Sequence, residues 1–424
     1  MTPSVWQIVQ RALESQLAGA AGDTALRKAL AKGPRPEPDV LHAAVDELDA
    51  IHRHRARLAW ALEQETAPVD ATNLALAWAA LGHRQSPEQL RKFTILSRAD
   101  ASLVARLGRR TLEDKHAPER VRLECPPAFE QHLGAALGER FATELRASLE
   151  PAPVDLRVNT LKASVAESME LLKKDRIEAK PTQWSPCGLR CAPDTKVSGT
   201  RAFANGLIEF QDEGSQLVSL LVDARRDHQV LDYCAGAGGK TMALAAAMQN
   251  KGHLVAADVN DERLARAKQR FKRASVENAE RRIIDADWAK RHRLRFDRVL
   301  VDAPCSGTGS WRRNPDARWS AAAAKLDELS ALQDKILDQA SHFVKPGGRL
   351  IYATCSLLPV ENDERIAAFL SSHDAFSLTP AHDVWATLGL GVWPFAEGQF
   401  LRLSPATHGT DGFFACVLTR AGRP

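Results

Sequence analysis

The chain has 424 residues, of which 44% are hydrophobic and 26% charged, a composition typical of an ordinary soluble globular protein. This length predicts two or three domains, and no apolar stretch approaches the length of a membrane span. The formal net charge of +4 is small for such a chain. Whole-protein electrostatics therefore permits a nucleic-acid partner without requiring one.

The cysteines indicate the compartment. There are seven, an odd number, and they are dispersed along the chain without the spacing of a disulfide framework. Cys187 and Cys191 are a close pair, but no second pair or histidine cluster accompanies them, so no metal site is expected. The first residues lack the basic segment and apolar run of a secretory signal. We expect a cytoplasmic protein.

Residues 1–122 are predicted to form a helical N-terminal domain, a candidate RNA-binding region. Val5, Ile8, Val9, Ala12 and Leu13 recur at helical spacing, and similar patterns follow between short breakers. Residues 52–57 contain two histidines and three arginines. This basic segment is either a contact for phosphate or the solvated face of a helix.

Residues 123–213 are predicted to form a small α+β module that binds RNA. A short alternating strand covers 155–160, a helix 164–174 and a second strand 206–210, with irregular sequence at 182–193. Arg157 and Asn159 give the first strand polar and basic side chains next to apolar positions. These side chains suit single-stranded nucleic acid, and they suit plain solvation equally well.

Residues 214–424 alternate strand and helix, which predicts a mostly parallel, doubly wound α/β sheet covered on both faces. The last two segments, 399–403 and 412–418, are expected to end the sheet as an antiparallel hairpin. The predicted strands cover 230–234, 253–258, 282–287, 297–302 and 349–353, and the predicted helices cover 240–249, 262–274 and 326–344.

A glycine-rich turn follows the first of these strands. Residues 239–241, Gly-Lys-Thr, resemble the end of a phosphate-binding loop, but Cys234 stands where that motif requires glycine. Asp258 follows at the interval of a ribose-binding acid, and Asp285 and Asp287 close the next predicted strand. Acids at successive strand ends fit S-adenosylmethionine better than a pyrophosphate, which they would repel. The alternative is that Asp258 or Asp287 caps the following helix.

Two cysteines follow two predicted strands of the sheet. Asp302-Ala303-Pro304-Cys305 ends one strand, and Thr354-Cys355-Ser356 ends the next strand along the chain. Because the carboxyl ends of parallel strands meet at one edge of a sheet, the two thiols are expected to converge there. Thiol chemistry is one interpretation, and a pair of buried structural cysteines is the other.

With these motifs in order, the chain resembles the RNA (cytosine-C5)-methyltransferase family, most closely its bacterial Sun/Fmu-type 16S ribosomal RNA branch. The resemblance runs from about residue 124 to the end and is strongest over 232–241, 302–309 with 313–319, and 352–362. It implies a class I S-adenosylmethionine-dependent methyltransferase fold preceded by the small module and the helical domain. The family loop reads Cys-Ala-Ala-Pro-Gly-Gly-Lys-Thr, whereas Gly236-Ala237 here replaces Ala-Pro, which makes the unbound loop more flexible.

The resemblance also implies a division of labour at the site. Cys355 is the expected nucleophile that adds to carbon 6 of cytosine, and Cys305 is expected to assist release of the adduct. Asp302 is expected to hydrogen-bond the base as a protonated carboxyl, and Lys240 to favour the thiolate. The residues expected to bind S-adenosylmethionine are Cys234, Ala235, Gly236, Ala237, Gly238, Gly239, Lys240, Asp258, Asp285, Asp287, Asp302 and Pro304.

The expected substrate is RNA, with ribosomal RNA favoured over transfer RNA because the helical region occupies the place of the Sun/Fmu extension. Arg312, Arg313 and Arg318 lie beside the cysteine loop and are predicted to hold the phosphates flanking a flipped base. A cofactor-binding RNA-assembly factor without catalysis is the alternative from another class. Cys305, Cys355, Asp302 and Lys240 argue against it, since a pure binder needs neither thiol. The protein is expected to be a monomer.

Overall fold

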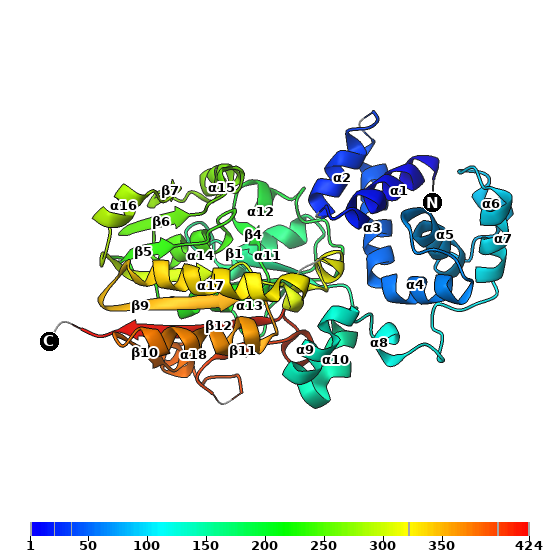
Figure 1. The fold of residues 1–424 in the computed structure, drawn as a ribbon. Helices are drawn as coiled ribbons and strands as arrows, with labels where there is room; N and C mark the ends of the chain where they lie inside the picture. Colours follow the sequence, from blue (N-terminus) through cyan, green and yellow to red (C-terminus); the bar gives the residue numbers. More distant parts are fainter. Residues whose placement is uncertain (1, 21, 35, 321–322, 397, 423–424) are drawn as a thin grey trace. The chain divides into compact units, whose positions relative to one another are not determined.

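The structure is a computed structural model that describes residues 2–20, 22–34, 36–320, 323–396 and 398–422 (Figure 1). The chain divides into two compact units, each built from two stretches of sequence. One contains Met1–Glu150 and Trp311–Lys325, and the other contains Pro151–Ser310 and Leu326–Pro424. The division into three domains with boundaries after residues 122 and 213 stays a prediction.

The first unit is helical. Its core is lined by Val9, Leu13, Leu58, Leu62 and Leu74, all essentially inaccessible to solvent. Side-chain caps begin several of the helices, among them the capping boxes of Ser86 and Ser97. The helices are α1 (Pro3–Leu17), α2 (Gly22–Leu30), α3 (Pro38–Arg53), α4 (Arg55–Gln64), α5 (Ala71–Leu81), α6 (Pro87–Leu90), α7 (Arg98–Leu107), α8 (Glu119–Arg122), α9 (Pro127–Leu137) and α10 (Phe141–Ala147).

Trp311–Lys325 belongs to this helical unit, although the sequence analysis assigned it to the catalytic region. The Trp311 ring packs edge-on against Phe129, with 5.4 Å between ring centroids. Trp319 donates from its indole nitrogen to the His52 carbonyl at 2.7 Å. The packing of the Trp311 ring and the hydrogen bond donated by Trp319 explain why the segment is buried among helices.

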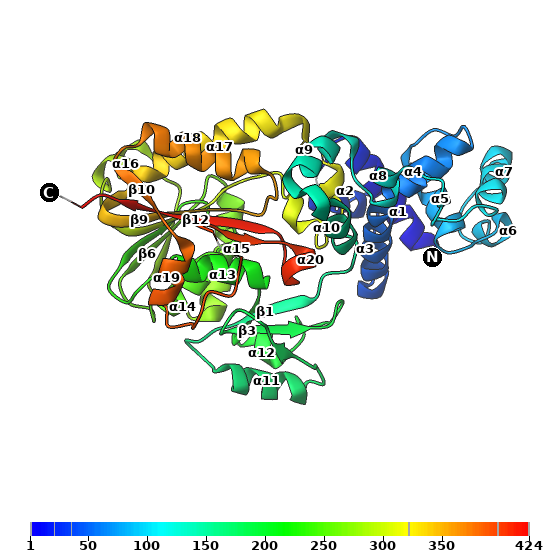
Figure 2. The ribbon, with the colours of Figure 1, turned by 90° about the horizontal axis from the view of Figure 1, so that it is seen from below.

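The second unit contains a small four-stranded antiparallel sheet in the order β2-β3-β1-β4. Helices α11 (Val165–Lys174) and α12 (Arg201–Ala204) lie beside it (Figure 2). The strand β3 (Gly188–Cys191) falls in a segment predicted to be irregular, because its few residues are flanked by turn-forming ones. The other strands are β1 (Val154–Val158), β2 (Lys180–Pro181) and β4 (Ile208–Phe210).

The large sheet has the order β10-β12-β9-β8-β5-β6-β7, with β11 paired to β12. Strands β5 to β9 pair in parallel, and β12 is antiparallel to β9, β10 and β11. The predicted mostly parallel sheet with an antiparallel end is confirmed. The strands are β5 (Gln229–Asp232), β6 (His253–Ala257), β7 (Ala279–Arg282), β8 (Phe296–Asp302), β9 (Val344–Thr354), β10 (Phe376–Thr379), β11 (Leu401–Leu403) and β12 (Phe413–Arg420).

Helices cover both faces of this sheet (Figure 2). One face packs against α13 (Glu213–Leu221), α14 (Gly239–Ala247), α15 (Asp261–Ala274) and α19 (Ala381–Thr387), and the other against α16 (Ala286–Arg291), α17 (Leu326–Ser341) and α18 (Asp363–Ser372). The short helix α20 (Pro405–His408) precedes β12. Burial on both faces explains the runs of Val, Leu, Ile and Ala in β5, β6, β8 and β9, whereas the edge strand β7 reads Ala-Glu-Arg-Arg and is not fully buried.

The strand predicted over residues 282–287 is wrong, because β7 lies at Ala279–Arg282 and the chain then turns into α16. Asp285 is the N-cap of that helix and accepts from the Trp288 backbone N–H at 2.7 Å. Ile283 and Ile284 therefore lie between the end of β7 and this cap, outside both regular elements. Among the residues described, no helix is long and apolar enough to cross a membrane.

Candidate active site

The two cysteine loops meet at the carboxyl edge of the large sheet. Strands β8 and β9 are parallel neighbours, with Asp302 in register with Ala353, so the chain leaves both strands at the same level. The Sγ atoms of Cys305 and Cys355 lie 3.4 Å apart, and both side chains are partly exposed. The structure therefore brings together the two thiols that the sequence analysis singled out.

The two thiols differ in their environment. A hydrogen bond to the Cys355 sulfur, together with burial, raises the pKa of Cys305 well above its ordinary value. Cys305 therefore keeps its proton and can donate it toward the sulfur of Cys355, the residue expected to be the nucleophile.

Lys240 and Asp302 form an ion pair beside the thiols, with 2.7 Å between Nζ and Oδ2. Burial opposes the charge on Lys240, but the charge of Asp302 and the hydrogen bond to it raise the lysine pKa. The sequence analysis expected Asp302 as a protonated carboxyl. In the structure this carboxyl group accepts from the Lys240 ammonium group, and its role toward the base stays a prediction.

Glu361 holds the two cysteine loops together and was not identified from the sequence. Its fully buried carboxylate accepts from the Ser306 backbone N–H at 2.8 Å and from the Ser306 and Ser356 hydroxyls. Gln333 donates to the same carboxylate at 3.1 Å and to the Pro304 carbonyl at 2.9 Å. Because Ser306 and Ser356 each follow one of the cysteines, this carboxylate fixes the distance between the loops.

Replacing Glu361 with alanine should lower the free energy of unfolding by about 2–4 kcal/mol, because several buried donors lose their acceptor. Urea denaturation followed by tryptophan fluorescence measures this change. The matched control is Glu364→Ala, at the start of the following helix α18, whose side chain is exposed. Equal stability of the two variants would contradict the bridging role of Glu361.

The glycine-rich turn between β5 and α14 is held by side chains from neighbouring elements. Gly238 has φ of +79°, and a Cβ there would lie 2.4 Å from the Phe271 ring, so only glycine fits. The Gly236 N–H donates to Asp258 at 2.8 Å, and Arg270 donates to the Ala237 carbonyl at 2.8 Å. Arg270 therefore restrains the position where the family loop has proline.

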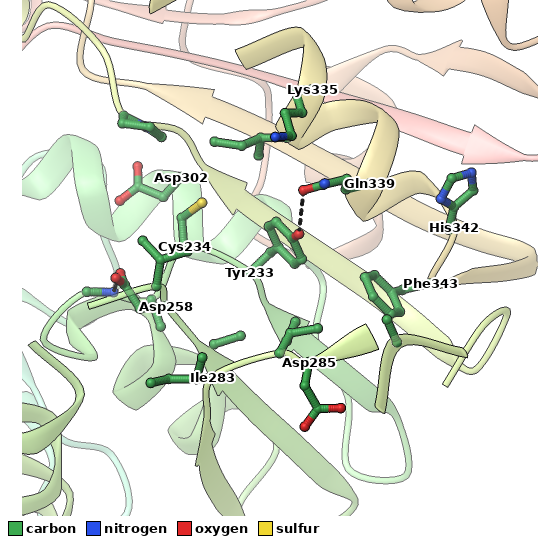
Figure 3. A pocket seen from close by; sticks show the side chains of 18 of the residues that line it. Tyr233, Cys234, Asp258, Ile283, Asp285, Asp302, Lys335, Gln339, His342 and Phe343 are labelled. Atoms are coloured by element: carbon green, nitrogen blue, oxygen red, sulfur yellow. Dashed lines mark hydrogen bonds between the residues drawn. The ribbon is translucent and has the colours of Figure 1, made fainter. Parts of the chain in front are cut away.

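A cavity of about 1070 Å³ opens beside this turn. Figure 3 shows Cys234, Asp258 and Asp302 on one side and His342 and Phe343 on the opposite side. The predicted cofactor residues that line it are Cys234, Ala235, Gly236, Ala237, Asp258, Asp285, Asp302 and Pro304. Backbone and acids thus surround a space large enough for a nucleoside with its side chain, which fits S-adenosylmethionine.

Two apolar residues on the rim of the cavity were missed from the sequence. Val259 is 96% exposed and Ile283 is 49% exposed, and both line the cavity. Exposed aliphatic side chains beside acids suit the faces of an adenine ring, which also needs polar partners at its edge. The sequence could have indicated them, because Val259 directly follows Asp258 and Ile283 stands two positions before Asp285.

The remaining predicted cofactor residues lie elsewhere. Asp287 is exposed on α16 and does not line the cavity, because the chain has already turned into the helix. It is Asp285 that caps this helix while also lining the cavity. Gly238 faces Phe271, and Gly239 and Lys240 border a second, smaller cavity.

Two of the predicted substrate residues in the small module are buried. Arg157 donates to the Gln211 side chain at 2.6 Å, and Asn159 donates to the carbonyls of Gly206 and Ala274. Their alternation with apolar residues suggested a polar surface, but β1 lies inside the small sheet between β3 and β4. Their position argues against RNA contact and indicates a role in holding the module together.

The arginines after the cysteine loop are also mostly interior. Arg318 is 2% exposed and donates to the Ser148 carbonyl at 3.0 Å, and Arg312 is buried as well. Their burial within the helical unit argues against the predicted phosphate contacts. Arg313 is partly exposed and remains a candidate.

The basic segment 52–57 carries less positive charge than its sequence suggested. Burial lowers the pKa of His52 to about 3 and that of His54 to about 4, so both are neutral at pH 7. The Arg53 side chain donates to the carbonyls of Leu149 and Arg312. This segment is therefore largely a packing element of the helical unit.

A doubly wound sheet with a glycine turn and acids after its first strands defines a class I S-adenosylmethionine-dependent methyltransferase. Two family descriptions match the chain: "16S rRNA methyltransferase RsmB/F" over residues 219–419 and "Methyltr_RsmF/B-like, ferredoxin-like domain" over residues 126–198. The chain belongs to this RsmB/F family.

Known proteins resemble the chain over most of its length. "Probable ribosomal RNA small subunit methyltransferase B" of Bacillus subtilis is 35% identical over 65% of this chain and 62% of its own length. "Ribosomal RNA small subunit methyltransferase B" of Yersinia enterocolitica is 38% identical over 66% and 62%. The crystal structure of PH0851 matches at a TM-score of 0.80 with 28% identity and covers 99% of both chains. The chain thus matches less than two thirds of the length of the two methyltransferases from Bacillus subtilis and Yersinia enterocolitica.

Replacing Asp258 with alanine should weaken S-adenosylmethionine binding about 10- to 100-fold. The substitution removes the acceptor of the Gly236 N–H and of the Asn260 N–H, and a carboxylate facing the cavity. Isothermal titration with S-adenosylmethionine measures the change. Asp287→Ala provides the matched comparison, and an equal loss there would contradict this placement of the cofactor.

Proposed function

We propose that the protein transfers a methyl group from S-adenosylmethionine to carbon 5 of a cytosine in 16S ribosomal RNA. The observation that carries the proposal is the pair of thiols 3.4 Å apart, next to the Lys240–Asp302 ion pair that borders the cofactor cavity. Family membership and the printed names of the relatives support this substrate class.

The chemistry follows from the weak nucleophilicity of cytosine carbon 5. When the Cys355 thiolate adds to carbon 6, carbon 5 becomes an enamine-like centre that accepts a methyl group. S-adenosylmethionine, when bound, supplies that methyl group as an electrophile. Asp302 and Lys240 lie where they can hydrogen-bond the polar edge of the base and balance the charge that develops on it.

Cys305 is suited to the second half of the reaction. Before the adduct forms, the hydrogen bond with Cys355 helps to keep the Cys305 proton in place. Once Cys355 is a thioether, it no longer carries the negative charge that favours this proton. Cys305, which is partly exposed, can then release its own proton to water and take the proton from carbon 5 as a thiolate; the electrons of the carbon–hydrogen bond restore the ring double bond as the Cys355–carbon bond breaks and Cys355 leaves as a thiolate.

The site favours catalysis over the alternative of a cofactor-binding assembly factor, because such a factor has no use for two converging thiols. Transfer RNA remains the competing substrate for the same reaction. The seven cysteines, all free, support the prediction of a cytoplasmic protein.

Bisulfite sequencing of 16S ribosomal RNA and transfer RNA, from cells with and without the gene, tests the function. Loss of one 5-methylcytosine from 16S ribosomal RNA is the expected result. A loss confined to transfer RNA would move the substrate, and no loss in either RNA would leave the assembly role standing. Complementation with the Cys355→Ala variant separates catalysis from binding in the same cells.

A further inference from the structure

A second cavity of about 310 Å³ lies between the small sheet and the glycine-rich turn of the same unit. It shares Cys234, Ala235 and Asp302 with the cofactor cavity, and Lys240 also borders it. Its volume is at the low end of the range for ligand pockets, about 300–1,000 Å³, so it has room for one small ring system. It therefore adjoins the reacting centre without being the cofactor cavity.

An exposed aromatic residue forms the outer wall of this cavity. Phe210, at the end of β4, is 40% exposed, whereas large apolar side chains of this unit are mostly buried. The Phe203 ring lies 5.1 Å from the Phe210 ring, and the Arg273 guanidinium lies 3.9 Å from the centroid of Phe203. An aromatic strip thus runs from the cavity along the small module. We use this name for Phe210, Phe203 and Arg273.

The electrostatics of the strip suit a nucleic acid. Arg270, which lines the cavity, and Arg273 share the carboxylate of Glu209, at 3.4 Å and 2.5 Å respectively. These two guanidinium groups and one carboxylate carry a net charge of +1, while the cavity wall itself also carries Lys240 and the acids Asp212, Asp232 and Asp302. An aromatic surface beside guanidinium groups is a combination that binds single-stranded RNA by stacking.

The polar groups of the cavity wall are already paired with protein. The Gln211 side chain accepts from Arg157 and donates to Ser215, and Asp212 accepts from the backbone N–H groups of Gly214 and Asp411. Groups committed to such partners are poorly placed to read the edges of a base. Recognition at this wall would therefore come from stacking, which tolerates any base.

We propose that Phe210, in the wall of the second cavity, forms a stacking subsite for an unpaired nucleobase next to the target cytosine, whose own polar edge would face Lys240 and Asp302 in that cavity. This inference rests on the proposed function and assigns a further part of the RNA-binding surface. Stacking a neighbouring base on Phe210 would hold the strand open beside the flipped cytosine. Phe210 is then a substrate-binding residue, and it acts without contact to the cofactor.

The experiment measures fluorescence anisotropy of a labelled 12-nucleotide single-stranded RNA of mixed sequence with the full-length protein. Phe210→Ala should weaken binding about tenfold to a hundredfold, and Phe210→Trp should keep wild-type affinity. The slope of affinity against salt concentration should stay unchanged, because no charge is removed. Titration with S-adenosylmethionine should give the same affinity for both variants and the wild type.

The matched control is Val392→Ala, which truncates another exposed apolar side chain that lines neither cavity. Binding of Phe210→Ala within twofold of wild type would overturn the subsite, as would a parallel loss of S-adenosylmethionine affinity, which would indicate a structural defect. Failure of wild type to methylate 16S ribosomal RNA would count against the proposed function instead. The RNA-binding measurement does not depend on that result.

Discussion

Replacing Cys355 with alanine is expected to reduce methyl transfer to background while S-adenosylmethionine still binds. Without a thiolate that adds to carbon 6, carbon 5 of cytosine stays too weak a nucleophile to take the methyl group. Transfer of tritiated methyl groups to 16S ribosomal RNA measures the activity, and titration calorimetry measures cofactor binding.

The control for this variant is Cys187→Ala, which removes another partly exposed thiol, in the small module. It should retain wild-type activity. Methyl transfer by Cys355→Ala at a substantial fraction of the wild-type rate would mean that another group attacks the base. The 3.4 Å thiol pair would then have a structural explanation.

Replacing Cys305 with alanine should produce the opposite result, a protein joined covalently to its RNA. The Cys355 thiolate can still add to the base and the methyl group can still be transferred, but the carbon-5 proton then lacks its base. The bond to Cys355 cannot break, so the adduct accumulates. It should appear as a slower band on a denaturing gel after incubation with RNA and S-adenosylmethionine.

The double variant Cys305→Ala, Cys355→Ala should give no such band, because the attacking sulfur is missing. A band in the double variant would show that another nucleophile forms the bond. Normal turnover by Cys305→Ala would show that the elimination step uses another base, and the roles assigned to the two cysteines would need revision.

The sequence predicted the thiol pair well because strand order in a parallel sheet determines where strand ends lie. Cys305 and Cys355 follow neighbouring strands, and no detail of side-chain packing was needed to bring them together. The same reasoning placed Asp258 at the cofactor cavity. It expected both Asp285 and Asp287 at this cavity, but only Asp285 lines it, because the chain has turned into α16 before Asp287.

Features that depend on long-range packing were not predicted. Glu361 looks like a surface residue in a polar run, and only the fold shows that its carboxylate is buried between two loops. Arg157 looked like an RNA contact and Arg318 like a phosphate ligand, because a sequence gives the charge of a side chain but not the partners that it will meet in the fold. The exposure of Phe210 likewise depends on the fold.

The course of the chain after the cysteine loop has a consequence for how this protein can be divided. The polypeptide passes between the two units three times, after Glu150, after Ser310 and after Lys325. A fragment that begins at Pro151 would carry Trp311 and Arg318 without the helices that bury them. Both side chains would then be exposed, five residues or more after Ser306 in the sequence. The helices of residues 1–150 are therefore needed to bury the residues that follow the cysteine loop.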